Sequence, residues 1–132
     1  MEISTNQLTI STSKSTLFDF LSKVENFEAI MPENISVFKI IDDDAFKFAL
    51  KGMPEIVLKF TERQPVDKIV LGSTNDQFPF KLEGVIGGTE NESTLSLIFS
   101  GSFNPMISMM IKTPLTNFIE TLAQKTVQHF AA

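Results

Sequence analysis

The segment that decides the fold runs from Asn104 to Phe130 and reads NPMISMMIKTPLTNFIETLAQKTVQHF. Asn104 suits an N-cap, because its side chain can accept a hydrogen bond from the first helical turn, and proline is favoured at the first helical position. Apolar residues then recur at intervals of three and four, the period of one helical face. That face comprises Ile107, Ile111, Leu115, Phe118 and Leu122. We therefore predict a long C-terminal helix that packs this face on a sheet.

The first part of this helix carries a second apolar face, formed by Met106, Met109 and Met110. Pro114 lacks the N–H that would bond the carbonyl of Met110, so we predict that the helix is bent or broken near Pro114. Two interpretations of the methionines stay open. Residues 105–113 can be deep core, or the methionines can form an adaptable apolar lip at a cavity mouth or a self-association surface. Membrane contact is disfavoured, because no basic cluster accompanies them.

The residues before this helix indicate an antiparallel sheet. Residues 2–11 form a predicted first strand, followed by a short helix after the N-cap Ser13 and another from Asn26 to Pro32. Between Ile35 and Phe103, apolar and polar residues alternate as in strands with one buried and one solvated face. Six predicted strands begin near residues 35, 46, 56, 68, 78 and 95. The predicted fold class is α+β, with a curved antiparallel sheet of about seven strands and the long helix across its concave face.

Composition narrows the class of protein. The 132 residues, 42% of them apolar, fit one domain spanning 1–132. All 13 aromatic residues are Phe, so the interior should be dry and poor in hydrogen-bonding groups. The absence of cysteine excludes disulfides and Cys-ligated metals. A net charge of −5 with scattered basic residues argues against nucleic-acid binding.

Two further patterns concern location. No apolar run approaches the roughly 18 residues of a membrane-spanning helix. The first ten residues, MEISTNQLTI, lack the basic and apolar parts of a signal peptide. We therefore predict a cytoplasmic protein with no membrane span.

Short motifs near the start resemble a known family. Thr9-Ile10-Ser11-Thr12 followed by Leu17-Phe18-Asp19-Phe20-Leu21 looks like a first strand running into a first helix, and Val24-Glu25-Asn26-Phe27 with Met31-Pro32 looks like a second short helix. These motifs and the order of elements resemble the START/SRPBCC superfamily of pollen-allergen-like, polyketide cyclase and lipid-transport proteins. The resemblance implies a helix-grip fold that encloses a cavity between the sheet and the last helix. The ligand-binding residues it implies are Phe46, Phe48, Leu58, Phe60, Phe80, Leu97, Phe99, Met106, Met110, Leu115, Phe118 and Leu122.

Few residues suit catalysis or metal binding. His129, the only histidine, falls in the last helical turn, where a surface role is expected. Arg63 is expected to be solvated at a strand end. The run Asp42-Asp43-Asp44 lacks the spacing of a calcium loop and is expected to form a hairpin tip. We assign no catalytic residue, no metal and no cofactor.

The predicted function is non-enzymatic binding or transport of an apolar small molecule, which could be lipid-like, an isoprenoid or quinone, or aromatic. The first alternative is a protein-interaction module that uses Met106, Met109 and Met110, including a homodimer through the Met106–Met110 region. The second is a polyketide cyclase-like enzyme, which the absence of tyrosine hydroxyl groups disfavours.

Overall fold

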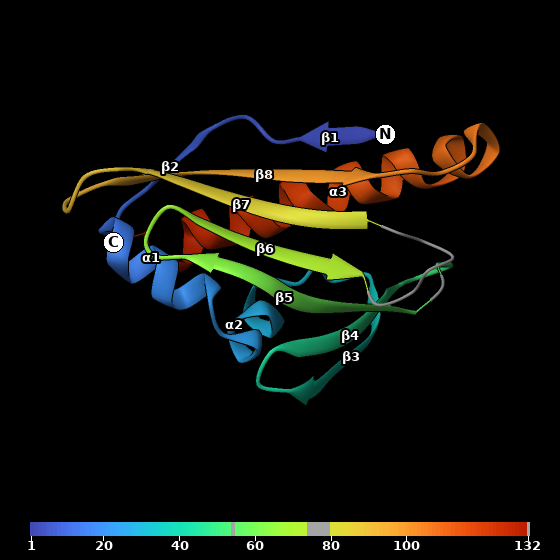
Figure 1. Ribbon diagram of the computed structural model, residues 1–132, viewed down its shortest axis with the longest axis horizontal. Helices are drawn as coiled ribbons and strands as arrows, with labels where there is room; N and C mark the ends of the chain where they lie inside the picture. Colours follow the sequence, from blue (N-terminus) through green and yellow to red (C-terminus); the bar gives the residue numbers. More distant parts are fainter. Residues whose placement is uncertain (54, 74–79, 132) are drawn as a thin grey trace.

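An antiparallel sheet with a long helix across its concave face makes up the fold (Figure 1). The computed structural model describes residues 1–53, 55–73 and 80–131. Within these residues the elements, in chain order, are β1 (Glu2–Ser4), β2 (Leu8–Ile10), α1 (Lys14–Leu21), α2 (Val24–Ile30), β3 (Ile35–Asp42), β4 (Ala45–Leu50), β5 (Ile56–Gln64), β6 (Lys68–Ser73), β7 (Phe80–Gly88), β8 (Ser93–Gly101) and α3 (Pro105–His129). The strand order is β1-β8-β7-β6-β5-β4-β3, and β2 also pairs with β8.

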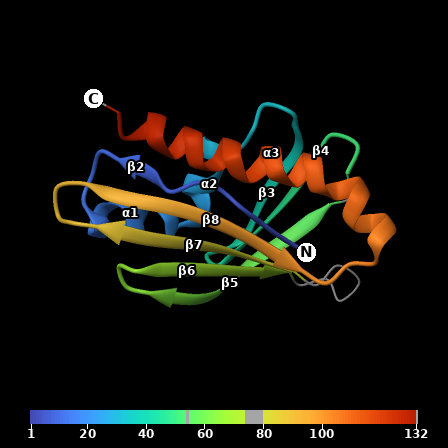
Figure 2. The same ribbon diagram turned by 90° about the horizontal axis from the view of Figure 1, so that it is seen from above.

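The predicted α+β class and the helix-grip arrangement are confirmed. Seen from above, α3 lies along the sheet, and α1 and α2 sit near the end of the sheet that faces the C-terminus (Figure 2). The alternating pattern produces a row of inward-facing apolar residues across neighbouring strands, because Phe60 pairs with Leu71, Leu71 with Leu82, and Leu82 with Phe99. The predicted beginning of a strand near residue 78 lies outside the described residues.

The predicted first strand over 2–11 is divided into β1 and β2, which both pair with β8. The division occurs at Thr5, whose backbone N–H donates to the carbonyl of Leu97 at 2.9 Å. The Thr5 hydroxyl oxygen in turn accepts a hydrogen bond from the Leu97 N–H at 3.0 Å. A side chain therefore replaces a backbone carbonyl in the ladder, and the next residues leave the strand path. This exchange explains why the apolar pattern of residues 2–11 is not one strand.

Helix starts follow the capping residues in two of the three helices of the described chain. Ser13 caps α1 by accepting a hydrogen bond from the N–H of Thr16, as predicted. The side chain of Asn104 does the same for Ile107 at 2.9 Å at the start of α3. The second helix begins at Val24 rather than at Asn26, because the Asn26 side chain donates to the Phe20 carbonyl at 2.9 Å instead of capping.

Helix α3 is continuous through Pro114. The predicted break is therefore absent in this fully described helix, whereas a bend is visible: the first turns, in orange, point away from the line of the later turns (Figure 2). Proline at this position removes one main-chain hydrogen bond and crowds the preceding turn, which is the usual cause of a bend. The stretches of α3 before and after Pro114 therefore run in different directions.

The core contains a chain of phenylalanine rings that joins the sheet to α3 and α2. Phe48 of β4 stacks on Phe118 of α3, with ring centroids 4.8 Å apart and planes inclined by 7°. The ring centroid of Phe46 lies 6.0 Å from that of Phe48 and 5.1 Å from that of Phe27 in α2. Offset and stacked aromatic pairs stabilise the fold by more than the apolar area they bury would do alone. The prediction of an interior built from Phe is thus realised around β4.

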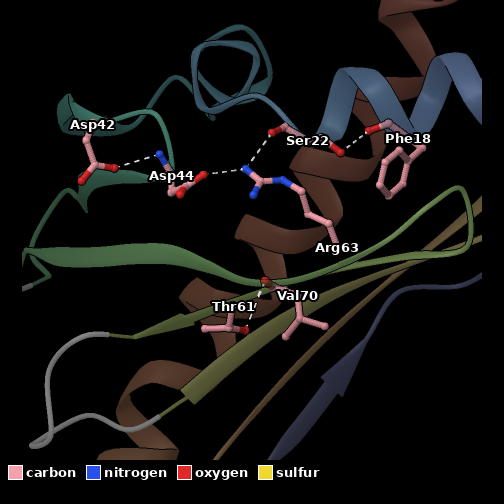
Figure 3. Close-up of polar contacts among 7 residues, drawn as sticks. All are labelled: Phe18, Ser22, Asp42, Asp44, Thr61, Arg63 and Val70. Atoms are coloured by element: carbon pink, nitrogen blue, oxygen red, sulfur yellow. Dashed lines mark hydrogen bonds and ion pairs between the residues drawn. The ribbon is translucent and has the colours of Figure 1, made fainter.

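Arg63 is exposed, as expected, and it also lies in a cluster of contacts (Figure 3). Its guanidinium donates to the Ser22 carbonyl at 3.1 Å and to the Asp44 carboxylate at 3.0 Å. The same group lies over the ring of Phe60, 4.0 Å from the centroid. Asp44 is held in turn by the acidic hairpin tip, where its N–H donates to Asp42 at 2.8 Å. One side chain therefore links the end of α1, the β3–β4 turn and β5.

We expect Arg63→Lys to destabilise the protein even though it keeps the charge. A single guanidinium nitrogen reaches both acceptors while the guanidinium lies over Phe60, and the lysine ammonium, which is not planar, cannot occupy both positions at once. Because the side chain remains 34% exposed, the expected loss is about 1 kcal/mol of unfolding free energy. Urea denaturation would measure it, with Lys59→Ala on the same strand as a control expected to change stability by less than about 0.5 kcal/mol. Equal effects of the two changes would contradict this account.

Candidate ligand-binding site

The predicted site residues divide into a buried majority and a surface minority. Phe80 is half-buried, whereas Met106 and Met110 are 73% and 70% exposed. The buried members are Phe46, Phe48, Leu58, Phe60, Leu97, Phe99, Leu115, Phe118 and Leu122. The interpretation of residues 105–113 as deep core is therefore wrong, because the methionines turn away from the sheet.

The space between the centre of the sheet and α3 is closely packed. A void of about 10 Å³ remains there, roughly the size of one water molecule. Leu97 and Leu122 from the predicted site border it, and Gly84 of β7 contributes to it because it has no side chain. A Cβ at Gly84 would lie 3.0 Å from Ile69, which leaves little room for filling. The predicted cavity is thus reduced to a small remnant in this part of the molecule.

A second, larger apolar space lies beneath the first half of α3. This apolar pocket has a volume of about 40 Å³. Its walls come from the turn after β4, from β5, β7 and β8, from the segment after β8, and from α3. The lining residues are Met53, Ile56, Phe80, Phe99, Phe103, Ile111 and Leu115. Three of them, Phe80, Phe99 and Leu115, were among the predicted ligand-binding residues.

Sequence reasoning missed four residues of the apolar pocket. Ile56 and Ile111 belong to the apolar faces that the periodicity identified, so the signal for both was present. Met53 lies in a turn and Phe103 lies just after β8. No periodic pattern predicts an inward side chain at Met53, whereas Phe103 continues the alternation of Leu97 and Phe99, so the signal for it was present. The rings of Phe80 and Phe99 are 4.8 Å apart, so the pocket floor is aromatic.

The helix above the apolar pocket is held unevenly. The buried residues of this fully described helix are Leu115, Phe118, Ile119, Leu122, Ala123 and Thr126, so they begin after Pro114. In the preceding turns, Ile107 and Ile111 are only half-buried. The later turns are also tied to α2, because the Lys125 ammonium donates to the Met31 carbonyl at 2.7 Å. Few buried contacts mean a low free energy of local opening, so the first half of α3 is the less stable half.

Ionisable side chains are absent from the residues that line the void and the apolar pocket. Thr126 is the polar residue of that set, and its hydroxyl donates to the Leu122 carbonyl at 2.8 Å. His129 is exposed at the other end of α3, with its ring 4.4 Å from that of Phe20. Among the described residues, no group of His, Cys, Asp and Glu side chains is arranged to hold a metal ion. The chemistry available at the apolar pocket is therefore contact with apolar groups.

Other hollows on the described surface are more open. One of about 590 Å³ lies beside the edge strand β1, where Glu2, Lys81 and Ser100 contribute to it. Another of about 210 Å³ lies between residues 5–8 and α3, beside Glu120 and Gln124. Both are bordered by polar residues and solvent, so neither resembles the enclosed, mostly apolar sites that hold small molecules.

Solved structures share this arrangement of sheet and helices. A START superfamily protein from Mycobacterium smegmatis is 14% identical, with a TM-score of 0.70 over 98% of this chain and 96% of that one. This chain has the START fold. Norcoclaurine synthase from Thalictrum flavum, solved in complex with dopamine and hydroxybenzaldehyde, is 11% identical with a TM-score of 0.70, over 100% of this chain and 89% of that one. A conserved protein from Geobacillus kaustophilus is 14% identical, with a TM-score of 0.66 over 98% and 95% of the chains.

Sequence comparison gives no corresponding match for this START-fold chain. No family model matches the sequence, and no curated protein matches it. At identities of 8–14%, the likeness to solved structures concerns the fold. Among the helices of residues 1–53, 55–73 and 80–131, none is long and apolar enough to cross a membrane.

Proposed function

We propose that this protein binds an apolar small molecule in the apolar pocket beneath the first half of α3. The observation that carries the proposal is the position of this pocket. Seven apolar residues from the sheet, α3 and two connecting segments converge on it, and the segment of helix that covers it has no buried residue before Leu115 within the described chain. A site with apolar walls and a weakly held cover is suited to take up an apolar molecule.

Size determines how such a molecule would bind. Sites for drug-sized ligands have volumes of about 300–1,000 Å³, whereas the apolar pocket has about 40 Å³. Binding therefore requires the walls to separate. The first half of α3 can move most easily, because Pro114 already lacks one main-chain hydrogen bond and the later turns are anchored by Leu115, Phe118 and Leu122. We infer that this half of the helix swings outward about Pro114 when a ligand enters.

The lining restricts the chemistry of the ligand. Because all seven side chains around the apolar pocket are apolar, a polar group buried among them would lose its hydrogen bonds with water without replacement. The bound part should therefore be a hydrocarbon or aromatic group of a lipid-like, isoprenoid, quinone or aromatic molecule. The complex of norcoclaurine synthase with dopamine and hydroxybenzaldehyde supports an aromatic ligand as one form of this proposal, since that protein shares the fold.

Binding or transport is favoured over catalysis by the same lining. General acid–base catalysis needs a titratable group within hydrogen-bond reach of the reacting atoms. The residues around the apolar pocket and the void do not include one. The proposed function is therefore that of a carrier or a sequestering protein.

Changes at Ile111 test the proposal. N-phenyl-1-naphthylamine, an apolar probe that fluoresces when it leaves water, should bind the wild-type protein. Ile111→Trp should weaken binding at least 10-fold, because the larger side chain occupies the pocket, whereas Ile111→Ala should preserve or strengthen it. Fluorescence titration measures both variants, and circular dichroism confirms that each is folded.

The matched control is Ile41→Trp, which should leave probe binding unchanged. Ile41 is an isoleucine on β3 that is 48% exposed. Native mass spectrometry followed by organic extraction would identify a molecule retained during purification. A wild-type protein that carries no extractable molecule and takes up no probe would refute the proposed function. Equal weakening by Ile111→Trp and Ile41→Trp would place the probe outside the apolar pocket.

Exposure of the methionines favours a second function. Met106, Met109 and Met110 are 73%, 82% and 70% exposed, which is unusual for large apolar side chains grouped on one surface. We propose an interaction surface there as the alternative function. Its partner is the subject of the next subsection.

A further inference from the structure

The methionine patch, defined as Met106, Met109 and Met110, occupies the solvent side of the first half of α3. At about 100° per residue, it lies on the side of the helix away from Ile111 and Leu115, which face the apolar pocket. These first turns reach past the ends of β7 and β8 at one end of the molecule (Figure 1). The patch is therefore presented on a projecting helix, where a second helix could approach it without meeting the strands.

The charge around the methionine patch is unusual for this protein. The chain has 16 acidic residues, yet residues 93–119 contain none, and Lys112 is the single charged residue in that stretch. The next acidic residue along α3 is Glu120. Two molecules with a net charge of −5 would repel each other through most of their surfaces. Because the methionine patch lies within this stretch, we expect that repulsion to be weakest there.

The spacing of the patch fits a helix–helix contact. Met106, Met109, Met110 and Thr113 fall at i, i+3, i+4 and i+7, which is the pattern of a seam between two packed helices. If two such seams pack antiparallel about a twofold axis between Met109 and Met110, each Met109 meets Met110 of the other copy, and each Met106 meets Thr113. The seam is thus complementary to itself, as a twofold interface requires.

We propose that the methionine patch joins two copies of this chain into a symmetric dimer, with the first halves of their α3 helices packed antiparallel. A standard interface buries about 800 Å² on each partner, which is more than three methionines supply. The half-buried Ile107, on the same helical turns as Met106 and Met110, extends the contact. An anionic membrane is a poorer partner, because Lys112 alone would offset the net charge of −5.

The dimer goes beyond the proposed ligand binding and does not rest on it. Sedimentation equilibrium of the full chain over a range of protein concentrations should show a reversible monomer–dimer equilibrium. Met109→Glu combined with Met110→Glu should weaken association at least 10-fold, because four carboxylates would meet at the axis, while circular dichroism stays unchanged. Ile41→Glu is the matched control, since Ile41 is an exposed apolar residue on β3, and it should leave association intact.

The absence of cysteine allows a direct test of the interface. Packed helices have axes about 8–10 Å apart, so a short bis-maleimide reagent should link two copies of a Met109→Cys variant. The same reagent should leave the two copies of an Ile41→Cys variant unlinked. A wild-type protein that is monomeric at all concentrations, or equal linkage of the two cysteine variants, overturns the proposal.

An assay with lipid vesicles distinguishes dimer formation from membrane binding. Flotation with phosphatidylglycerol vesicles should leave the wild-type protein unbound. A monomer that floats with the vesicles, and loses this property on the double glutamate change, would assign the methionine patch to a lipid surface and refute the dimer. Probe binding in the apolar pocket is read separately by fluorescence, so failure of the dimer and failure of the proposed function are distinguishable.

Discussion

Replacing Phe118 with alanine should lower the free energy of unfolding by about 3–5 kcal/mol. The Phe118 ring is buried and stacks on Phe48, so its removal loses apolar burial, leaves a cavity and breaks the aromatic contact between α3 and β4. The loss is large because this contact joins the sheet to the later turns of α3, where the helix is best anchored. Chemical denaturation followed by circular dichroism measures it.

Phe130→Ala is the comparison for this change. Phe130 is half-buried at the end of α3, with its ring 5.2 Å from that of Phe20. Its removal should cost less than half as much as the removal of Phe118, because part of the space it leaves is open to water. Similar losses at the two positions would mean that the core does not centre on the Phe48–Phe118 pair.

Pro114→Ala should raise the free energy of unfolding by up to about 3 kcal/mol. Alanine restores the main-chain hydrogen bond to the carbonyl of Met110 and removes the ring that crowds the preceding turn. The same change should slow the uptake of N-phenyl-1-naphthylamine several-fold, because the proposed outward movement of the first half of α3 depends on weakness at this point. Thermal denaturation and stopped-flow fluorescence give the two readouts.

Thr113→Ala serves as the control for helix propensity. Thr113 is exposed and adjacent to Pro114. Alanine there should stabilise the helix by less than about 0.7 kcal/mol without changing its hydrogen bonds. Its rate of probe uptake should match that of the wild-type protein. If Pro114→Ala stabilises the protein but leaves the rate unchanged, the ligand reaches the apolar pocket without a movement about Pro114.

Local patterns were sufficient to predict most of the elements. Ser13 and Asn104 are caps whose chemistry depends on a few neighbouring residues, and the alternation in β4 and β8 depends only on which face is buried. The division of residues 2–11 was not predictable in this way. It rests on the Thr5 hydroxyl and the N–H of Leu97, which meet only in the folded sheet.

The candidate site was predicted less completely, because volume and orientation are tertiary properties. Periodicity identified Leu115, Phe118 and Leu122 as core residues, but it carries no information on how tightly their side chains interlock. Both faces of the first half of α3 are apolar, so sequence alone left two orientations open for Met110. Arg63 presents the same difficulty, since its partners Ser22 and Asp44 are distant in the chain.

The pairing of Thr5 with Leu97 also has a consequence for the order of events during synthesis. The two residues are 92 positions apart, and β1 and β2 pair with β8 in the described sheet. At about 5–20 residues per second, the ribosome takes roughly 5–20 s to make the intervening chain. Ile3 and Ile10, which are buried in the finished protein, remain without their strand partner for that time. The consecutive strands β3 to β7 can pair as each emerges, so the first ten residues are the last part of the sheet to be closed.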